Sequence, residues 1–266
     1  MRSVFALIRA DGLATLSYRL QTLLSLGGLL FSIVPLYFIA GALQPVMAKA
    51  IASEGQQYFA FVVVGTIAYL LLMTTVGALP EAIRSGIGRG TLEAMLATPT
   101  PLPFLVTGMV GFPLLWTALR AGVVLVSAWF LGAHVSWDRL VPALGILALL
   151  VLAHLPFALV TASLILAFRT PGPFPQGVLT VSALLGGVYY PTQVIPSWLH
   201  EISSYLPLTY GLRALRRELL DRVPWDALVP DVMALLAFVI ALVPVSLLLF
   251  AWSLRYARRA GTLAQY

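Results

Sequence analysis

The sequence predicts an all-α integral membrane protein with six transmembrane helices. Hydrophobic residues make up 60% of the 266 residues and charged residues only 10%, whereas soluble domains carry about 25% charged residues. Apolar runs of about 20 residues, long enough for a helix to cross a hydrocarbon core about 30 Å thick, recur along the chain. The six predicted spans cover residues 22–43, 58–79, 104–132, 140–168, 177–189 and 231–254.

We expect one transmembrane domain over residues 1–266, because no internal repeat or low-complexity tract divides the chain. Three segments outside the spans have a distinct character. They are residues 1–21, 80–103 and 190–230.

The first of these, residues 1–21, is predicted to be an interfacial helix. Apolar residues such as Phe5 and Ile8 alternate with charged ones such as Arg2 and Arg9, a composition typical of an amphipathic helix lying in the membrane surface. A solvated tail is the alternative.

Basic residues indicate the orientation of the chain. Arginines flank the ends of the spans that share a side with the N-terminus, and they include Arg19, Arg84, Arg89, Arg169 and Arg255. The short loops on the opposite side hold only Lys49 and Arg139. The positive-inside rule therefore predicts that both termini are cytoplasmic. Segment 190–230 is the exception, with four arginines on the predicted outer face; long loops follow the rule less closely.

Segment 80–103 joins the second and third spans on the predicted cytoplasmic side. Thr91 can cap a new helix, Glu93 lies near its positive end, and Pro99 ends it. One apolar face would hold Leu92, Met95 and Leu96. A short, rigid surface helix of this kind can transmit force from a cytoplasmic partner, or it can simply connect the two spans.

Segment 190–222 contains two short amphipathic helices separated by Pro207. The first places Leu199, Ile202 and Leu206 on one face, and the second does so with Leu208, Leu212, Leu215 and Leu219. Neither is long enough to span, so we expect a re-entrant or outer-leaflet hairpin, with an exposed loop as the alternative. The arginines of the second helix are expected to point to water or lipid headgroups.

The sequence offers no nucleotide-binding or hydrolytic motif. A phosphate loop requires a lysine after a glycine-rich turn, and the single lysine, Lys49, lies in "VMAKAIA". His200 and Glu201 lack the second histidine of a metalloprotease helix. If ATP drives this protein, a separate subunit binds it.

Two ionisable residues, Arg120 and His154, fall well inside predicted spans. His154 is expected to hydrogen-bond another helix, with a metal ligand, proton relay or acyltransferase base as alternatives. A charge at Arg120 costs several kcal/mol unless it is paired, hydrated or able to snorkel to an interface. If functional, Arg120 and His154 would line a transport pathway or a dimer interface.

The stretches "RGTLEAMLATPTP" and "GGVYYPTQVIPSWLHEISSYLPLTYGLRALR" resemble the signature pair of ABC-2-type transporter permeases. These are the membrane subunits of ABC exporters for drugs, lipid-linked polysaccharides and related amphiphiles. The resemblance extends over nearly the whole chain and includes the six spans, the cytoplasmic termini and the missing nucleotide site.

The resemblance implies roles for two groups of residues. The coupling helix that docks on the ATPase would include Arg89, Gly90, Thr91, Leu92, Glu93 and Pro99, with Glu93 as the polar anchor. The outer hairpin that caps the exit of the pathway would include Tyr190, Pro191, Pro196, Trp198, Pro207 and Arg213.

The resemblance also implies partners and location. The chain would export a hydrophobic or amphiphilic substrate with two copies of a cytoplasmic ATPase and a second permease, identical or paralogous. It would hold no catalytic residue, cofactor or metal, because ATP and Mg²⁺ belong to the ATPase. Membrane lipid, and no nucleic acid, would surround it in the cytoplasmic (inner) membrane of a bacterium or archaeon.

Two other function classes remain open from the sequence. A non-transporting membrane anchor or assembly factor that recruits an ATPase would share the coupling helix. An intramembrane enzyme using His154, His200 or Glu201 is the other.

Overall fold

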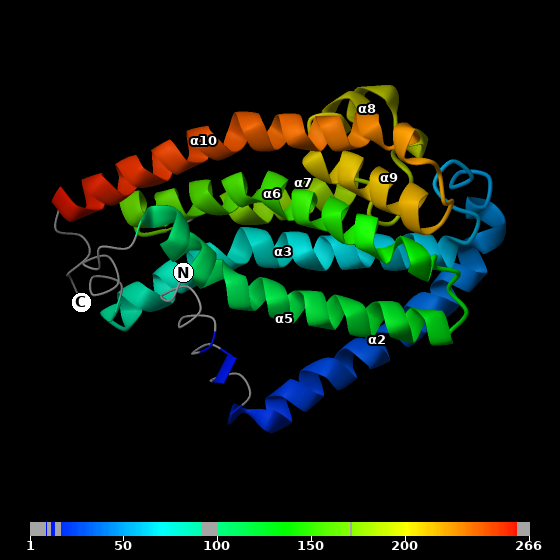
Figure 1. Cartoon of the computed structure of the whole chain (residues 1–266), viewed down its shortest axis with the longest axis horizontal. Helices are drawn as coiled ribbons and strands as arrows, with labels where there is room; N and C mark the ends of the chain where they lie inside the picture. Colours follow the sequence, from blue (N-terminus) through cyan, green and yellow to red (C-terminus); the bar gives the residue numbers. More distant parts are fainter. Residues whose placement is uncertain (1–8, 10–11, 14–16, 92–100, 171, 260–266) are drawn as a thin grey trace.

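The described part of the chain is helical and contains no strand. The computed structural model describes residues 9, 12–13, 17–91, 101–170 and 172–259. The helices, shown in Figure 1, are α2 (Arg19–Met47), α3 (Tyr58–Gly88), α5 (Leu102–Phe130), α6 (Leu140–Phe168), α7 (Phe174–Leu185), α8 (Ser197–Ser203), α9 (Pro207–Leu219) and α10 (Val229–Arg259). Short 3₁₀ turns lie at Trp137–Arg139, Thr192–Val194 and Trp225–Ala227.

Among the described residues five helices, not six, are long and apolar enough to cross a membrane: α2, α3, α5, α6 and α10. The prediction of a full-length span at residues 177–189 is wrong, because α7 has 12 residues. Such a helix rises about 18 Å, well short of a hydrocarbon core about 30 Å thick.

The bundle has two ends, which Figure 1 places at the right and the left. We call the right end, which carries the connections 48–57, 131–139 and 220–228, the hairpin end. We call the left end, where α3, α6 and α10 finish, the Arg89 end. The chain returns from α6 to α10 by way of α7, α8 and α9, which together replace one span.

The helix α7 stops where it meets α9. The backbone turns at Gly187, whose φ is +83°, a value that glycine adopts without strain. A Cβ atom at Gly186 would lie 2.8 Å from Leu208 Cδ2, so the end of α7 contacts the start of α9 closely. The path of the chain from α6 to α10 is therefore not one continuous helix, because the backbone turns at Gly187 after α7.

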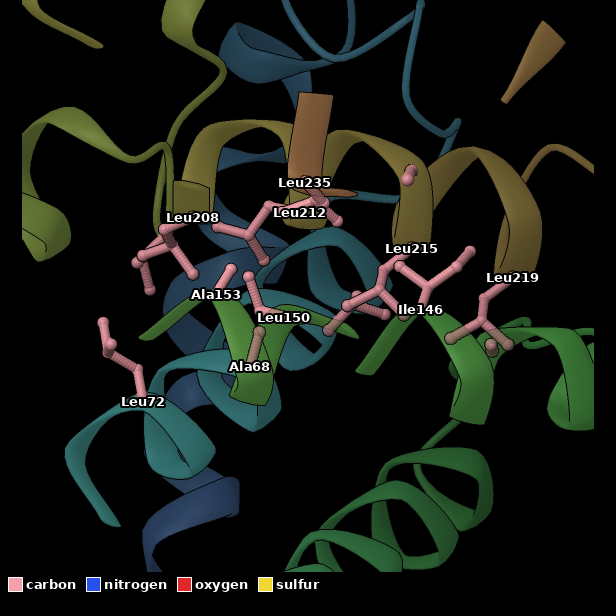
Figure 2. Packing of buried hydrophobic residues seen from close by; sticks show 14 of the residues in the cluster. Ala68, Leu72, Ile146, Leu150, Ala153, Leu208, Leu212, Leu215, Leu219 and Leu235 are labelled. Carbon is pink, nitrogen blue, oxygen red and sulfur yellow. The ribbon is translucent and has the colours of Figure 1, made fainter. Parts of the chain in front are cut away.

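The predicted split of segment 190–222 into two helices at Pro207 is confirmed, and α9 is far more buried than α8. Figure 2 shows the packing of α9 against α3, α6 and α10. The four predicted apolar positions Leu208, Leu212, Leu215 and Leu219 all lie in this core. At Gly211 a Cβ atom would lie 2.4 Å from Leu150 Cδ1, so the absence of a side chain lets α9 approach α6.

Two long helices depart from the expected boundaries or packing. The second predicted span continues past residue 79 and through Pro80 to Gly88, so α3 includes the beginning of segment 80–103.

Helix α2 contacts α3 and α5 but buries only Ile33 and Ala40. Most of its apolar surface is free to contact lipid or another protein chain.

Candidate functional site

Arg216 is a fully buried charge near the hairpin end, only 1% exposed. Its guanidinium donates hydrogen bonds through Nη1 to Glu54 Oε2 at 3.1 Å, through Nη2 to the Val188 carbonyl at 2.9 Å, and through Nε to the Phe61 carbonyl at 3.2 Å. It also stacks on the Phe61 ring, 3.3 Å from its centroid. These contacts join α9 to α3, to the loop before α3, and to the turn after α7.

Burial lowers the pKa of Arg216 to about 10, and the charge of Glu54 opposes this shift. Arg216 lies in α9, outside the spanning helices, and remains protonated at neutral pH. A buried, charged guanidinium needs a partner of opposite charge, and Glu54, itself 4% exposed, supplies it.

The close approach of the turn after α7 and of Arg216 to α3 depends on Gly65 of α3. A Cβ atom there would lie 2.1 Å from the Val188 carbonyl oxygen and 2.8 Å from Arg216 Nη2. Only a residue without a side chain allows the turn after α7 and the Arg216 side chain to reach α3 together.

Four further arginines at this end pair with acidic residues. Arg213 binds Asp231, with Nε at 2.8 Å from Oδ1, and Arg217 lies 3.7 Å from Asp231 Oδ2. The remaining pairs are Arg139 with Glu218 at 3.5 Å and Arg222 with Asp138 at 2.9 Å. We call Arg139, Arg213, Arg216, Arg217, Arg222 and their partners Glu54, Asp138, Glu218 and Asp231 the arginine network.

The arginine network corrects one expectation and explains another. Arg216 does not point to water or headgroups as expected, because it is buried on Glu54, whereas Arg213 and Arg217 bind Asp231 and stay partly exposed. Pairing also explains how segment 190–230 carries so many positive charges: the acids offset them locally. The sequence contained one signal of burial, since Arg216 lies four residues after Leu212, on the apolar face of α9.

The other predicted hairpin residues lie around this network, with different exposures. Pro191 and Pro207 are buried, whereas Pro196 and Trp198 are exposed at the start of α8. Tyr190 donates a hydrogen bond from its hydroxyl to the Leu184 carbonyl, which ties the turn back to α7. Trp198, 62% exposed, is the predicted hairpin residue most available to a ligand or lipid.

Three of the six predicted coupling residues lie in the part of the chain that the structure describes. Arg89 ends α3 and donates through Nη2 to Ser85 Oγ at 2.9 Å, and Gly90 follows with φ +67°. Thr91 is described and exposed. Leu92, Glu93 and Pro99 lie outside the described residues.

A cleft of about 490 Å³ between α3 and α5 opens beside these residues at the Arg89 end. Its lining is mixed: polar side chains such as Glu81, Ser85, Arg89 and Thr91 lie among apolar ones such as Met73 and Met109. At its inner end Thr74 and Thr117 share an interhelical hydrogen bond of 2.8 Å. The two helices are thus joined in the interior and separated near the coupling residues.

Two larger cavities face the sides of the bundle and are almost entirely apolar. One of about 720 Å³ lies between α5 and α6 over α3, and one of about 760 Å³ lies between α6 and α7. Their volumes fall in the range of about 300 to 1,000 Å³ seen for small-molecule sites. Both could accept apolar chains.

His154 and Arg120 occupy different environments. His154 is 1% exposed, and its Nδ1 lies 2.8 Å from the Leu150 carbonyl of its own helix, so the expected bond to another helix is not among the described contacts. Arg120 is half-buried in α5, and its Nε has no hydrogen-bond partner among the described residues. Within those residues no group of three or more acidic or histidine side chains could hold a metal ion.

Comparison with known proteins adds to this geometry. Residues 4–220, which include the described cleft, α9 and most of the bundle, match the family model described as ABC-2 type transporter. The chain belongs to the ABC-2 type transporter family. Members of this family are membrane permeases, and the ATPase activity of such transporters resides in partner chains.

Three curated relatives share the name nodulation protein J. The protein of Rhizobium leguminosarum bv. viciae is 27% identical over 203 residues, which cover 74% of this chain and 75% of the relative. Those of Sinorhizobium fredii and Bradyrhizobium diazoefficiens are 26% and 28% identical, with 64% of each chain covered. This chain therefore spans about three quarters of the first relative and less than two thirds of the other two.

The family assignment explains why the chain contains a transport architecture without a nucleotide site. This ABC-2 permease is a multi-pass membrane protein, and its family places ATP and Mg²⁺ in the partner ATPase. The polar features found here, the arginine network and the Arg89-end cleft, lie at opposite ends of the bundle.

Proposed function

We propose that this ABC-2 permease exports a hydrophobic or amphiphilic substrate across the cytoplasmic membrane of a bacterium or archaeon. The family match carries the proposal. The apolar cavities between α5 and α6 and between α6 and α7 favour cargo with an apolar part over a small ion.

In this proposal the Arg89 end faces the cytoplasm and the hairpin end faces outward. The arginines near the Arg89 end, such as Arg84, Arg89 and Arg255, are exposed, as the positive-inside rule requires. At the hairpin end the arginine network balances its positive charges with acids. Both termini are then cytoplasmic.

Segment 89–99 acts as the coupling helix. Arg89, Gly90 and Thr91 lead away from α3 beside the polar cleft, and Leu92, Glu93 and Pro99 continue the segment in the sequence. Helix α3 is continuous from the hairpin end, where it lies beside Arg216 and Glu54, to Arg89 at the other end. A displacement of segment 89–99 is therefore transmitted along a single rigid helix.

The transport cycle is alternating access in a complex of two permeases and two ATPases. ATP binding closes the ATPase pair, and the coupling segments follow, because ATP binds the two states with different affinity. The second permease is identical or paralogous, and the free surface of α2 offers it contact area. Tyr190, Pro191, Pro196, Trp198, Pro207 and Arg213 surround the outward exit.

The test is co-purification of the tagged chain with ATPases encoded by neighbouring genes. We expect an ATPase to co-purify with the wild type, and Glu93→Arg to abolish its binding or its stimulation. Glu201→Arg is the matched control, because Glu201 is exposed on α8 at the other end, and this variant should bind normally. If no ATPase binds the wild type, the proposal fails.

A non-transporting anchor that recruits an ATPase would pass this first test. Reconstitution of the complex into proteoliposomes separates the two functions. The exporter accumulates a labelled amphiphile on the side opposite the ATPase in the presence of ATP, whereas an anchor hydrolyses ATP without moving it.

A further inference from the structure

Arg120 is a cation placed deep in a spanning helix, and no hydrogen bond or ion pair joins it to the described residues. It lies ten residues before the end of α5 at Phe130, which corresponds to about 15 Å along the helix, half of a hydrocarbon core of about 30 Å. Trp129 and Trp137 pack edge to face, 5.9 Å apart, at the end of this helix, where aromatic residues mark a membrane surface. Arg120 is therefore close to the midplane.

The guanidinium of Arg120 is not satisfied by the described part of the chain. Its Nε is shielded from solvent and has no hydrogen-bond partner, and no ion pair is formed with the described acidic residues. A buried or membrane-embedded charge is costly unless it is paired or hydrated. Every arginine of the arginine network, in contrast, has an acidic partner.

The described spanning helices of a second, identical copy offer no carboxylate at the depth of Arg120. Within the described helices α2, α3, α5, α6 and α10 the acidic residues are Glu81 and Asp231, and Asp138 and Asp226 lie just before α6 and α10. Asp231 lies in the first turn of α10 and is engaged by Arg213, and Glu81 lies in the part of α3 nearest Arg89. Neither lies at the depth of Arg120, so the described spanning helices place no carboxylate beside it.

The residues beside Arg120 are suited to an apolar chain. Phe112 and Trp116 precede it at intervals of four residues on the same face of α5, and their rings stack with centroids 6.4 Å apart. A Cβ atom at Gly12 would lie 3.2 Å from Phe112 Cε2, so Gly12 lies at the end of this aromatic stripe away from Arg120.

From the orphaned guanidinium and the adjoining stripe, we propose that Arg120, Trp116 and Phe112 form an intramembrane site for an exported anionic amphiphile. Arg120 binds its phosphate or carboxylate through the planar guanidinium, and the apolar chain lies along Trp116 and Phe112. This assignment rests on the proposed export function and narrows its cargo from any amphiphile to one that carries an anionic group.

The test measures binding without the ATPase, so that it can fail independently of the proposed function. The purified full-length chain is placed in phosphatidylcholine nanodiscs and titrated with dodecyl phosphate brominated in mid-chain, which quenches nearby tryptophan. The part of the quenching that is lost in Trp116→Phe reports on Trp116. Dodecyl maltoside with the same bromine is the neutral probe.

We expect saturable quenching of Trp116 by the phosphate probe and weak quenching by the maltoside. Arg120→Gln should weaken the binding of the phosphate probe about tenfold or more, the usual effect of losing a charge-assisted hydrogen bond. Arg120→Lys should retain part of the affinity. Arg255→Gln, which removes an exposed arginine near the end of α10, is the matched control and should bind as the wild type does.

Equal binding by Arg120→Gln and wild type, in samples with equal thermal stability, would overturn the site. So would equal affinity for the two probes. Displacement of the probe by phosphatidylglycerol at ordinary bilayer fractions would identify a resident lipid instead of cargo and overturn that assignment. If the site binds as expected while no ATPase co-purifies, the export function fails and the anion site stands.

Discussion

Arg216 of α9 and Glu54 of the loop before α3 form a 3.1 Å ion pair in the interior of the hairpin end. They are separated by 162 positions in the sequence. Because both are buried, each charge depends on the other, and the pair fixes the position of α9 relative to α3.

Removing one member of this pair should strongly destabilise the protein. We expect Glu54→Gln to lower the free energy of unfolding by about 3 kcal/mol, because it leaves Arg216 buried without its counter-charge. In the double variant Glu54→Gln with Arg216→Met, the loss of unfolding free energy should be smaller than the sum of the two single losses. Denaturant unfolding in detergent measures all three variants, and strictly additive losses would contradict the coupling.

Gly65 should tolerate no side chain. Gly65→Ala is expected to cost about 1 to 3 kcal/mol of unfolding free energy, because the new Cβ meets the Val188 carbonyl and Arg216. Gly77→Ala in the same helix is the control, since nothing lies within 4 Å of its Cβ position. The thermal unfolding midpoint of Gly65→Ala should lie below that of Gly77→Ala. Equal midpoints would show that the contact between α3 and the turn after α7 has room for a methyl group at Gly65.

Asp231 should contribute to the stability of the protein, whereas Asp226 should not. Asp231→Asn weakens the contacts to Arg213 and Arg217, so we expect a loss of about 1.5 kcal/mol. Asp226 is exposed and forms no ion pair among the described residues, and Asp226→Asn should change stability by less than about 0.5 kcal/mol. Faster proteolysis in segment 190–222 for Asp231→Asn alone would support the role of the arginine network.

His154→Leu should leave ATPase stimulation and complex assembly unchanged. The substitution is close in volume and removes a buried Nε2 that has no partner among the described residues, so the change in unfolding free energy should stay below about 1.5 kcal/mol. The intramembrane-enzyme alternative instead predicts a loss of activity with normal assembly. ATPase assays and size-exclusion chromatography on the reconstituted complex distinguish the two.

Local patterns predicted much of the fold. The apolar runs identified the regions of α2, α3, α5, α6 and α10, because length and composition alone decide whether a helix can span. The split at Pro207 and the buried leucines of α9 followed from helical spacing. The continuation of α3 through Pro80 was missed, since a proline inside a membrane helix is tolerated when neighbours compensate for the lost hydrogen bond.

Long-range pairing could not be predicted from such patterns. Whether Arg216 contacts water or Glu54 depends on a partner far away in the sequence, and no window around Arg216 contains that information. The early end of α7 likewise depends on Leu208 occupying the space beside Gly186. For the candidate site, the family signature named Arg213 of the arginine network, but the acids that complete the network were not among the predicted residues.

The separation of Glu54 from Arg216 also bears on synthesis of the chain. At about 5 to 20 residues per second, the ribosome needs roughly 8 to 30 s to make the 162 residues between them. During this time Glu54 has no partner, and α3 is in the membrane before α9 exists. Nascent chains that stop before α9 thus lack the counter-charge of Glu54, and α9 completes the bundle late in translation.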